Sequence, residues 1–253
     1  MLKKYKITDT LSFSLKLEQN QIEEEMKGKL IIGKHDDFSS NSSVTCPLKH
    51  VSTGDIFWVC EVNSVGLQNS NYYVESKIGS NYAIFDTGTN VIIIPIEYYK
   101  EFSSQISNFG CQTIKEQGTY QLLCQKKYRI DFRFKINNNV LIVPKSVGFY
   151  KVYGDIYYSK IVFSPGYFII GSPFFVTFHT LFDKDNEKLH FYPENPTYLE
   201  KNDQYNIFSI AGIVLALIII LVIFGFIIYK CIIWQKSKRE VEDFPSSNYQ
   251  VYI

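Results

Sequence analysis

The sequence contains one uninterrupted apolar run, Ile207–Tyr229, that carries no charged residue. About 23 residues at about 1.5 Å rise per residue reach roughly 35 Å, which is enough to cross a hydrocarbon core of about 30 Å with some tilt. A buried helix of a soluble protein would rarely be apolar on every face over this length. We therefore expect a single transmembrane helix at residues 207–229.

The charges on either side of this run predict its orientation. Residues 200–206 contain one cation, whereas four follow the run: Lys230, Lys236, Lys238 and Arg239. Because cytosolic flanks carry the excess of Lys and Arg, residues 230–253 are predicted to be a cytosolic tail of a single-pass membrane protein. The large N-terminal portion then lies on the lumenal or extracellular side, where disulfides and glycans form.

The portion before the apolar run is predicted to consist mostly of strands. The chain has 19 Tyr and 20 Phe residues, and aromatic side chains fit pleated, half-buried surfaces. Residues 11–17 alternate between apolar and polar, residues 177–183 and 188–192 predict a hairpin, and only residues 96–106 show helical spacing. The 26 basic and 25 acidic residues nearly balance, so no nucleic-acid partner is expected. Four scattered His residues without a ligand motif predict no metal site, and no cofactor is expected.

Four cysteines lie on the lumenal or extracellular side: Cys46, Cys60, Cys111 and Cys124. An even number in an oxidising compartment predicts two disulfides, although four cysteines permit three connectivities. Our expectation is local pairing, 46 with 60 and 111 with 124, with each bond contributing about 3 kcal/mol to the free energy of unfolding. Asn41 begins an Asn-Ser-Ser sequon and is a candidate glycosylation site.

An acidic turn directly follows a short apolar segment. Asp86-Thr87-Gly88-Thr89 comes after residues 81–85, and a second apolar segment, residues 91–94, comes next. A lone Asp-Thr-Gly is most often an exposed turn. Between two buried strands, however, the carboxylate is placed where neighbouring backbone groups hold it. The context therefore favours a functional carboxylate at Asp86 over an exposed turn.

This motif, in the form Ala83–Thr89, resembles the second catalytic motif of the pepsin-like aspartic proteases. Further segments resemble other parts of that family in the same order along the chain. They are Phe13–Leu17, Gly28–Asp36, Phe57-Trp58, Cys111 with Cys124, Ile130–Phe132, Val143-Pro144, Phe168–Phe174 and Thr180–Asp183. The resemblance covers about residues 8–195, and the C-terminal apolar run is similar to the anchor of the memapsin branch.

The resemblance implies an all-β fold, namely the C-terminal lobe of a pepsin-like protease with part of the sheet between the lobes. Residues 1–62 would form the end of the N-terminal lobe and the interlobe strands, and residues 63–198 the C-terminal lobe. A juxtamembrane linker, residues 199–206, would precede the transmembrane helix.

The resemblance also implies an activity, which is the hydrolysis of peptide bonds in polypeptides by a water held between two aspartates. Asp86 would be one of them. Thr87 would join the interlock beneath the carboxylates, and Gly88 would let the other catalytic loop approach closely. Thr89 would form a hydrogen bond with Asp86. Behind the active-site loop would lie Ile169, Ile170 and Gly171.

The sequence departs from the family in one serious respect, because it contains no second Asp-Thr-Gly or Asp-Ser-Gly. One carboxylate cannot supply the general base and the general acid together. The first residues also lack the apolar segment of an export signal. We therefore expect that an N-terminal lobe with the second aspartate is missing from this chain. Two alternatives stay open: a non-catalytic protein that keeps the lobe for peptide binding, favoured by Asn90 in place of the family's usual Ser, and a protease built from two copies of a single lobe.

Overall fold

The computed structural model describes residues 9–19, 26–33, 43–49, 57–201 and 220–234. Its contacts divide the chain into two compact units, residues 1–202 and residues 203–253. In the second unit, residues 220–234 form a helix. Within the described ranges, no helix combines the length and the apolar character needed to cross a membrane. Residues 207–219 of the expected transmembrane segment lie outside those ranges.

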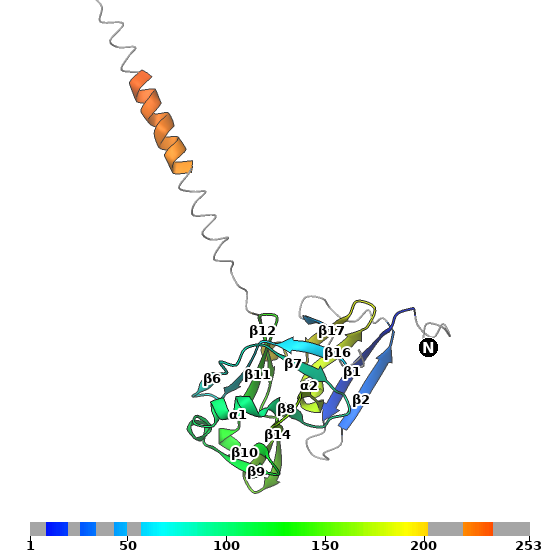
Figure 1. The fold of residues 1–253 in the computed structure, drawn as a ribbon. Helices are drawn as coiled ribbons and strands as arrows, with labels where there is room; N and C mark the ends of the chain where they lie inside the picture. The colour runs from blue at the N-terminus through cyan, green and yellow to red at the C-terminus, as the bar shows by residue number, and fades with distance from the viewer. Residues whose placement is uncertain (1–8, 20–25, 34–42, 50–56, 202–219, 235–253) are drawn as a thin grey trace, which may run out of the picture. The chain divides into compact units, whose positions relative to one another are not determined.

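The first unit consists mainly of strands in three sheets, with a few short helices (Figure 1). Its strands are β1 (Ser12–Gln19), β2 (Met26–Ile32), β3 (Val44–Pro47), β4 (Val59–Val62), β5 (Ser64–Gln68), β6 (Tyr73–Glu75), β7 (Asn81–Phe85), β8 (Ile92–Pro95), β9 (Cys111–Glu116), β10 (Thr119–Gln125), β11 (Asp131–Ile136), β12 (Asn139–Val143), β13 (Phe149–Tyr153), β14 (Ile156–Ser164), β15 (Phe168–Ile170), β16 (Phe178–Asp183), β17 (Lys188–Pro193) and β18 (Leu199–Lys201). Its α-helices are α1 (Ile96–Phe102) and α2 (Ser172–Thr177), and its 3₁₀ turns are η3 (Ile106–Phe109), η4 (Lys126–Tyr128) and η5 (Pro196–Tyr198).

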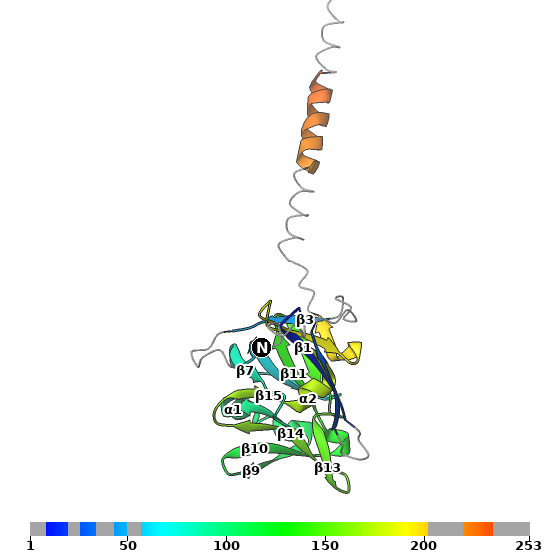
Figure 2. The same cartoon turned by 90° about the vertical axis from the view of Figure 1, so that its right-hand side faces the viewer.

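The strand order of the central, eight-stranded sheet positions the acidic turn. This sheet runs β4-β7-β15-β8-β14-β10-β9, with β13 paired to β14 (Figure 2). β15 lies between β7 and β8, parallel to β7 and antiparallel to β8. Because β7 and β8 are not neighbours, the loop between them, residues 86–91, has to pass over the end of β15.

Two five-stranded sheets complete the unit, in the orders β2-β1-β16-β17-β3 and β18-β12-β11-β5-β6. Aromatic side chains join the first of them to the central sheet. The ring of Phe85 on β7 lies 5.4 Å from that of Phe174 on α2 and 5.1 Å from that of Phe191 on β17. All three residues are buried, so the strand that ends at Asp86 is fixed from below by the core.

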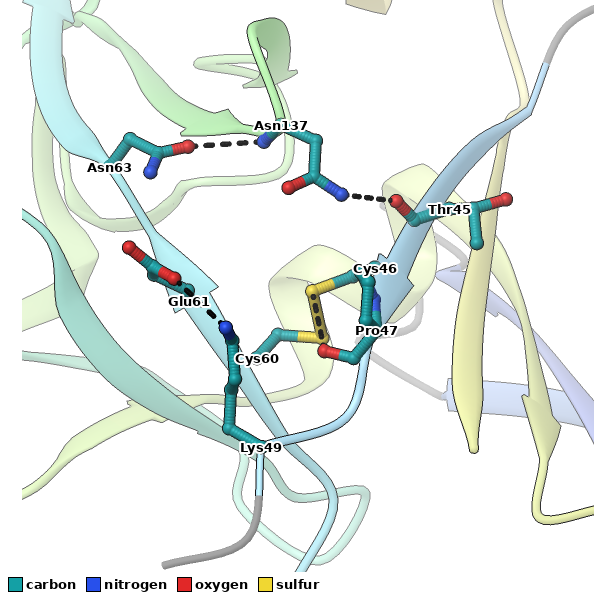
Figure 3. The surroundings of a disulfide bond; sticks show 8 residues. All are labelled: Thr45, Cys46, Pro47, Lys49, Cys60, Glu61, Asn63 and Asn137. Carbon is teal, nitrogen blue, oxygen red and sulfur yellow. Dashed lines mark hydrogen bonds and ion pairs between the residues drawn. A yellow bond between two sulfur atoms is a disulfide. The ribbon is translucent and has the colours of Figure 1, made fainter. Parts of the chain in front are cut away.

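Both disulfides have the predicted local pairing. Cys46–Cys60 joins β3 to β4 and so links two sheets (Figure 3). Next to it, Asn137 donates to the carbonyl of Thr45 over 2.7 Å, and its backbone N–H donates to Asn63 Oδ1 over 3.1 Å. The second bond, Cys111–Cys124, connects directly opposite residues of β9 and β10.

Several predicted elements are confirmed and others are wrong in extent. β7 has the predicted bounds, and β16 and β17 form the predicted hairpin. The predicted helix of residues 96–106 is interrupted: α1 ends at Phe102, and Ile106 begins η3. Ser103 and Ser104 lie at the break, and serine competes for backbone hydrogen bonds in helices. Between β10 and β11 the chain forms η4.

β1 is a strand as predicted, but its burial pattern is reversed. Ser12 and Ser14 are buried, whereas Phe13, Leu15 and Leu17 keep part of their surface exposed. The apolar face of β1 therefore lies at the margin of the core. Residues 199–201 of the expected linker form β18, which pairs with β12. The boundary predicted between residues 62 and 63 stays a prediction.

Candidate active site

Asp86 is placed by the end of β7 and by β15 beneath it. Its backbone N–H donates to the carbonyl of Ile170 over 3.0 Å, continuing the β7–β15 pairing by one residue. At the other end of the turn, the backbone N–H of Ser172 donates to the carbonyl of Thr89 over 2.8 Å. The turn is thus held by the end of β15 on one side of the motif and by the first residue of α2 on the other.

Both carboxylate oxygens of Asp86 accept hydrogen bonds from within the turn. The backbone N–H of Gly88 donates to Oδ1 over 2.9 Å, and the Thr89 hydroxyl donates to Oδ2 over 2.6 Å. Asp86 is half-buried, whereas Thr87 and Gly88 are exposed. The carboxylate therefore has a fixed orientation at an open edge of the unit.

Gly171 allows this loop to lie close to β15. A Cβ atom at this position would lie 2.1 Å from the carbonyl oxygen of Val91 and 2.4 Å from that of Thr89. Backbone atoms cannot yield at such distances, so a side chain at residue 171 would displace the loop. Of the preceding residues, Ile170 is buried beneath the loop and Ile169 lies opposite Ile93 of β8.

The sequence analysis missed one residue that holds the loop. The hydroxyl of Ser172, which is buried, donates to the carbonyl of Asn90 over 3.2 Å. Ser172 follows Gly171 directly, and a polar residue after an apolar strand and a glycine was the available signal.

A cleft of about 540 Å³ opens beside Asp86, and most of its lining is apolar or aromatic. The lining residues are Phe13, Phe57, Trp58, Val59, Tyr82, Ile84, Phe85, Asp86, Thr87, Tyr167, Ile169 and Phe182. Its aromatic floor comes from three strands or loops far apart in the chain. The rings of Phe13 and Phe182 stack at 4.5 Å, and Trp58 lies 5.2 Å from Phe182. Large apolar side chains at the rim, such as Tyr82 and Tyr167, are exposed.

Asp86 is the only carboxylate among the described residues that line this cleft. Two other aspartates accept hydrogen bonds outside the cleft. Asp131 accepts one from the backbone N–H of Lys145 over 2.6 Å, and Asp183 accepts one from the side chain of Asn186 over 2.7 Å. The site can orient one carboxylate toward an apolar cleft. Acid and base catalysis together need a second ionisable group. The sequon at Asn41 lies outside the described residues.

Three comparisons with known proteins bear on the family and the fold. A family model described as "Eukaryotic aspartyl protease" matches residues 1–193. No curated protein matches the chain. Among solved structures, the chain is similar to the aspartic proteinase from Irpex lacteus, with a TM-score of 0.60 and 16% sequence identity. The match covers 76% of this chain and 59% of that one, so the chain spans less than two thirds of the length of that relative. At this identity the likeness shows the fold alone.

Proposed function

The chain belongs to the eukaryotic aspartyl protease family, and from that premise we propose that Asp86 is one of two catalytic carboxylates of an endopeptidase that acts on polypeptides. One observation carries the proposal: a carboxylate with both oxygens hydrogen-bonded stands on an exposed turn at the edge of an open apolar cleft. A structural turn in the same place would need no cleft beside it.

The second carboxylate is proposed to come from a further lobe that covers the turn. The exposure of Thr87 and Gly88 and the uncovered cleft support this view. Two carboxylates about 3 Å apart cannot both ionise, so they share one proton and titrate as a unit. The ionised partner then holds and deprotonates a water, while the protonated partner donates to the scissile carbonyl. The hydrogen bonds from Gly88 and Thr89 would keep Asp86 aimed at that water.

The catalytic test compares two identical chemical changes. Full-length protein purified from its native source is assayed on an internally quenched peptide between pH 3.5 and 6. Asp86→Asn is expected to lower kcat/KM by roughly 10²-fold or more, because it removes an acid–base group. Asp9→Asn, at an exposed carboxylate that does not line the cleft, is expected to leave the rate unchanged. Equal activity of Asp86→Asn and wild type would refute the assignment of Asp86.

A non-catalytic peptide-binding function is the second candidate, and one observation favours it: Asp86 is the sole carboxylate among the described residues of the cleft. Pepstatin, whose hydroxyl needs both carboxylates, separates the two functions. Tight pepstatin binding supports the protease. Peptide binding without pepstatin binding or cleavage supports the second candidate. A rate that rises with the square of protein concentration would indicate that two copies of the chain form the dyad.

We further propose that residues 207–229 anchor the protein in a membrane, with the first unit lumenal or extracellular and the C-terminal tail cytosolic. The charge-free run, the basic residues after it and the two disulfides of the first unit support this orientation. Protease added to sealed microsomes should remove only the tail, and Asn41→Gln should remove one glycan. Digestion of the first unit in sealed vesicles would reverse the proposed topology.

A further inference from the structure

A second hollow lies outside the cleft, and its lining is basic. Its volume is about 580 Å³, and it is lined by Gln125, Lys126, Lys127, Arg129 and Asp155. None of these residues lines the cleft beside Asp86. The surrounding segment, residues 111–165, carries nine Lys or Arg residues against three Asp or Glu, although the whole chain is nearly neutral. Charge is therefore balanced over the chain but not within this segment.

The cations Lys126, Lys127 and Arg129 belong to a segment that is packed tightly against the unit. The ring of Tyr128 in η4 packs against Gly110, where a Cβ atom would lie 2.7 Å from the ring. The carbonyl of Tyr128 lies 3.5 Å from the sulfur of Cys111, in the disulfide with Cys124. Arg129 donates to the carbonyls of Lys126 and Lys145 over 3.2 and 3.3 Å. These contacts fix η4, so its lysines are presented from a defined position.

Residues 126–129 adjoin the hairpin of β13 and β14. The backbone N–H of Lys126 donates to the carbonyl of Asp155 in the hairpin turn over 2.9 Å. The guanidinium of Arg129 lies 4.4 Å from the ring centre of Tyr157 on β14, and Tyr157 is opposite Lys151 on β13. The basic hollow and the hairpin therefore form one continuous surface, which we call the basic hairpin surface.

β13 is an edge strand with exposed side chains on both faces. Within the described part of the chain it pairs only with β14, so its other edge has free backbone groups. Tyr150, Lys151, Val152 and Tyr153 are all exposed, Tyr153 at 83%, and the register of β13 with β14 shifts between Lys151 and Tyr153. Figure 1 places β9 and β10, next to this hairpin, at the end of the unit opposite β12, which carries β18. The surface thus lies away from the strand that leads out of the unit.

We propose that the basic hairpin surface binds an acidic, extended polypeptide segment that adds a strand to the edge of β13. Strand addition satisfies the free backbone groups, and acidic side chains on one face of the added strand would lie on the face of Lys151, where Arg129 packs on Tyr157. The intervening positions would place apolar side chains on the face of Tyr150. A lipid surface offers no strand to the backbone edge, so a polypeptide is the better match.

The test uses a fluorescent 12-residue peptide of alternating Glu and Val, with fluorescence anisotropy as the readout and the full chain in a nonionic detergent. Binding is expected to weaken as salt rises. Lys126→Gln/Lys127→Gln/Lys151→Gln is expected to weaken binding roughly tenfold or more. The matched control, Lys77→Gln/Lys100→Gln/Lys188→Gln, removes the same charge from exposed lysines elsewhere and is expected to change the affinity less than about twofold.

Two further probes keep the proposal falsifiable without altering the protein. A peptide N-methylated at every residue keeps its charge but can donate no backbone hydrogen bond to the edge of β13, and it is expected to lose binding. A Lys–Val peptide is expected not to bind. The proposal is overturned if either modified peptide binds as well as the first, or if the two triple variants lose affinity equally. It is also overturned if phosphatidylserine vesicles, and not the peptide, bind in a manner that depends on Lys126, Lys127 and Lys151.

Discussion

Gly171 is the residue on which the geometry of the acidic turn most directly depends. Thr89 and Val91 bring their carbonyl oxygens within 2.4 Å of the position that a Cβ atom would occupy. At Gly171 the turn is therefore in contact with backbone atoms that directly follow β15. Any side chain at residue 171 has to separate them, and the hydrogen bond from Ser172 N–H to Thr89 would be lost with the contact.

Gly171→Ala is therefore expected to lower the free energy of unfolding by about 3 kcal/mol or more, since overpacking against backbone has no cheap relaxation. Thermal unfolding measures the change, at about 2–4 °C per kcal/mol for a unit of this size. Gly79→Ala is the control, because nothing lies within 4 Å of its added Cβ atom. Similar melting temperatures for the two variants would contradict the close contact.

His190 makes the stability of the first unit sensitive to pH. Burial lowers the pKa of His190 below its usual 6.5, and Lys188 lowers it further, while Asp183 raises it. The unfolded chain then binds a proton more readily than the folded one, so the free energy of unfolding falls as the pH drops below about 6.5. His190→Gln is expected to lose less stability than wild type between pH 7.5 and 5. Equal losses in denaturant titrations at the two pH values would show that His190 does not contribute.

At the scale of elements, β18 depends on one ion pair as well as on its pairing with β12. Arg133 on β11, only 10% exposed at its side chain, binds the carboxylate of Glu200 with both terminal nitrogens. The ring of Tyr73 lies 5.1 Å from the guanidinium, and burial raises the pKa of Tyr73 to about 12, with Glu75 adding to the rise. A buried cation thus holds β18 in place.

Glu200→Ala is expected to lower the free energy of unfolding by about 1–2 kcal/mol, because it leaves the guanidinium of Arg133 without its carboxylate. Hydrogen exchange of the β18 amides should accelerate as well. Glu18→Ala serves as the control, since the carboxylate of Glu18 is 72% exposed and lies 3.7 Å from Lys16; its effect is expected to stay below about 0.5 kcal/mol. Unchanged exchange at Leu199 in Glu200→Ala would show that strand pairing alone holds β18.

Elements with a complete local signal were predictable from sequence. β7 is an apolar segment that ends at an acidic turn, and β16 and β17 flank Asp185-Asn186, so each carries its own boundary. α2 has no polar face, because Pro173, Phe174 and Phe175 are all buried, and helical periodicity is therefore invisible in it.

The insertion of β15 between β7 and β8 is a long-range pairing without a local signal. For the same reason sequence identified Asp86 but not the aromatic floor of its cleft, which joins Phe13, Trp58 and Phe182 from distant segments.

At the scale of the whole first unit, the two disulfides close loops of nearly equal length, because their cysteines are 14 and 13 residues apart in the sequence. One bond joins strands of two different sheets, whereas the other joins neighbouring strands of one sheet. Chain entropy predicts that Cys46→Ser/Cys60→Ser and Cys111→Ser/Cys124→Ser each lower the free energy of unfolding by about 3 kcal/mol. Only the first bond links two sheets, so only its removal is expected to accelerate hydrogen exchange in β3. Unaltered protection of the β3 amides would show that the hydrogen bonds of Asn137 suffice to hold this junction.

The position of β15 also determines when the acidic turn can form as the chain leaves the ribosome. Asp86, Thr87 and Gly88 leave the ribosome before the strand that holds their turn from beneath, which begins only at Phe168. A nascent chain that stops before that residue contains the whole motif but has no floor under it. The carboxylate is therefore aimed only after β15 has been translated, and the turn lacks its supporting strand while the intervening residues are made.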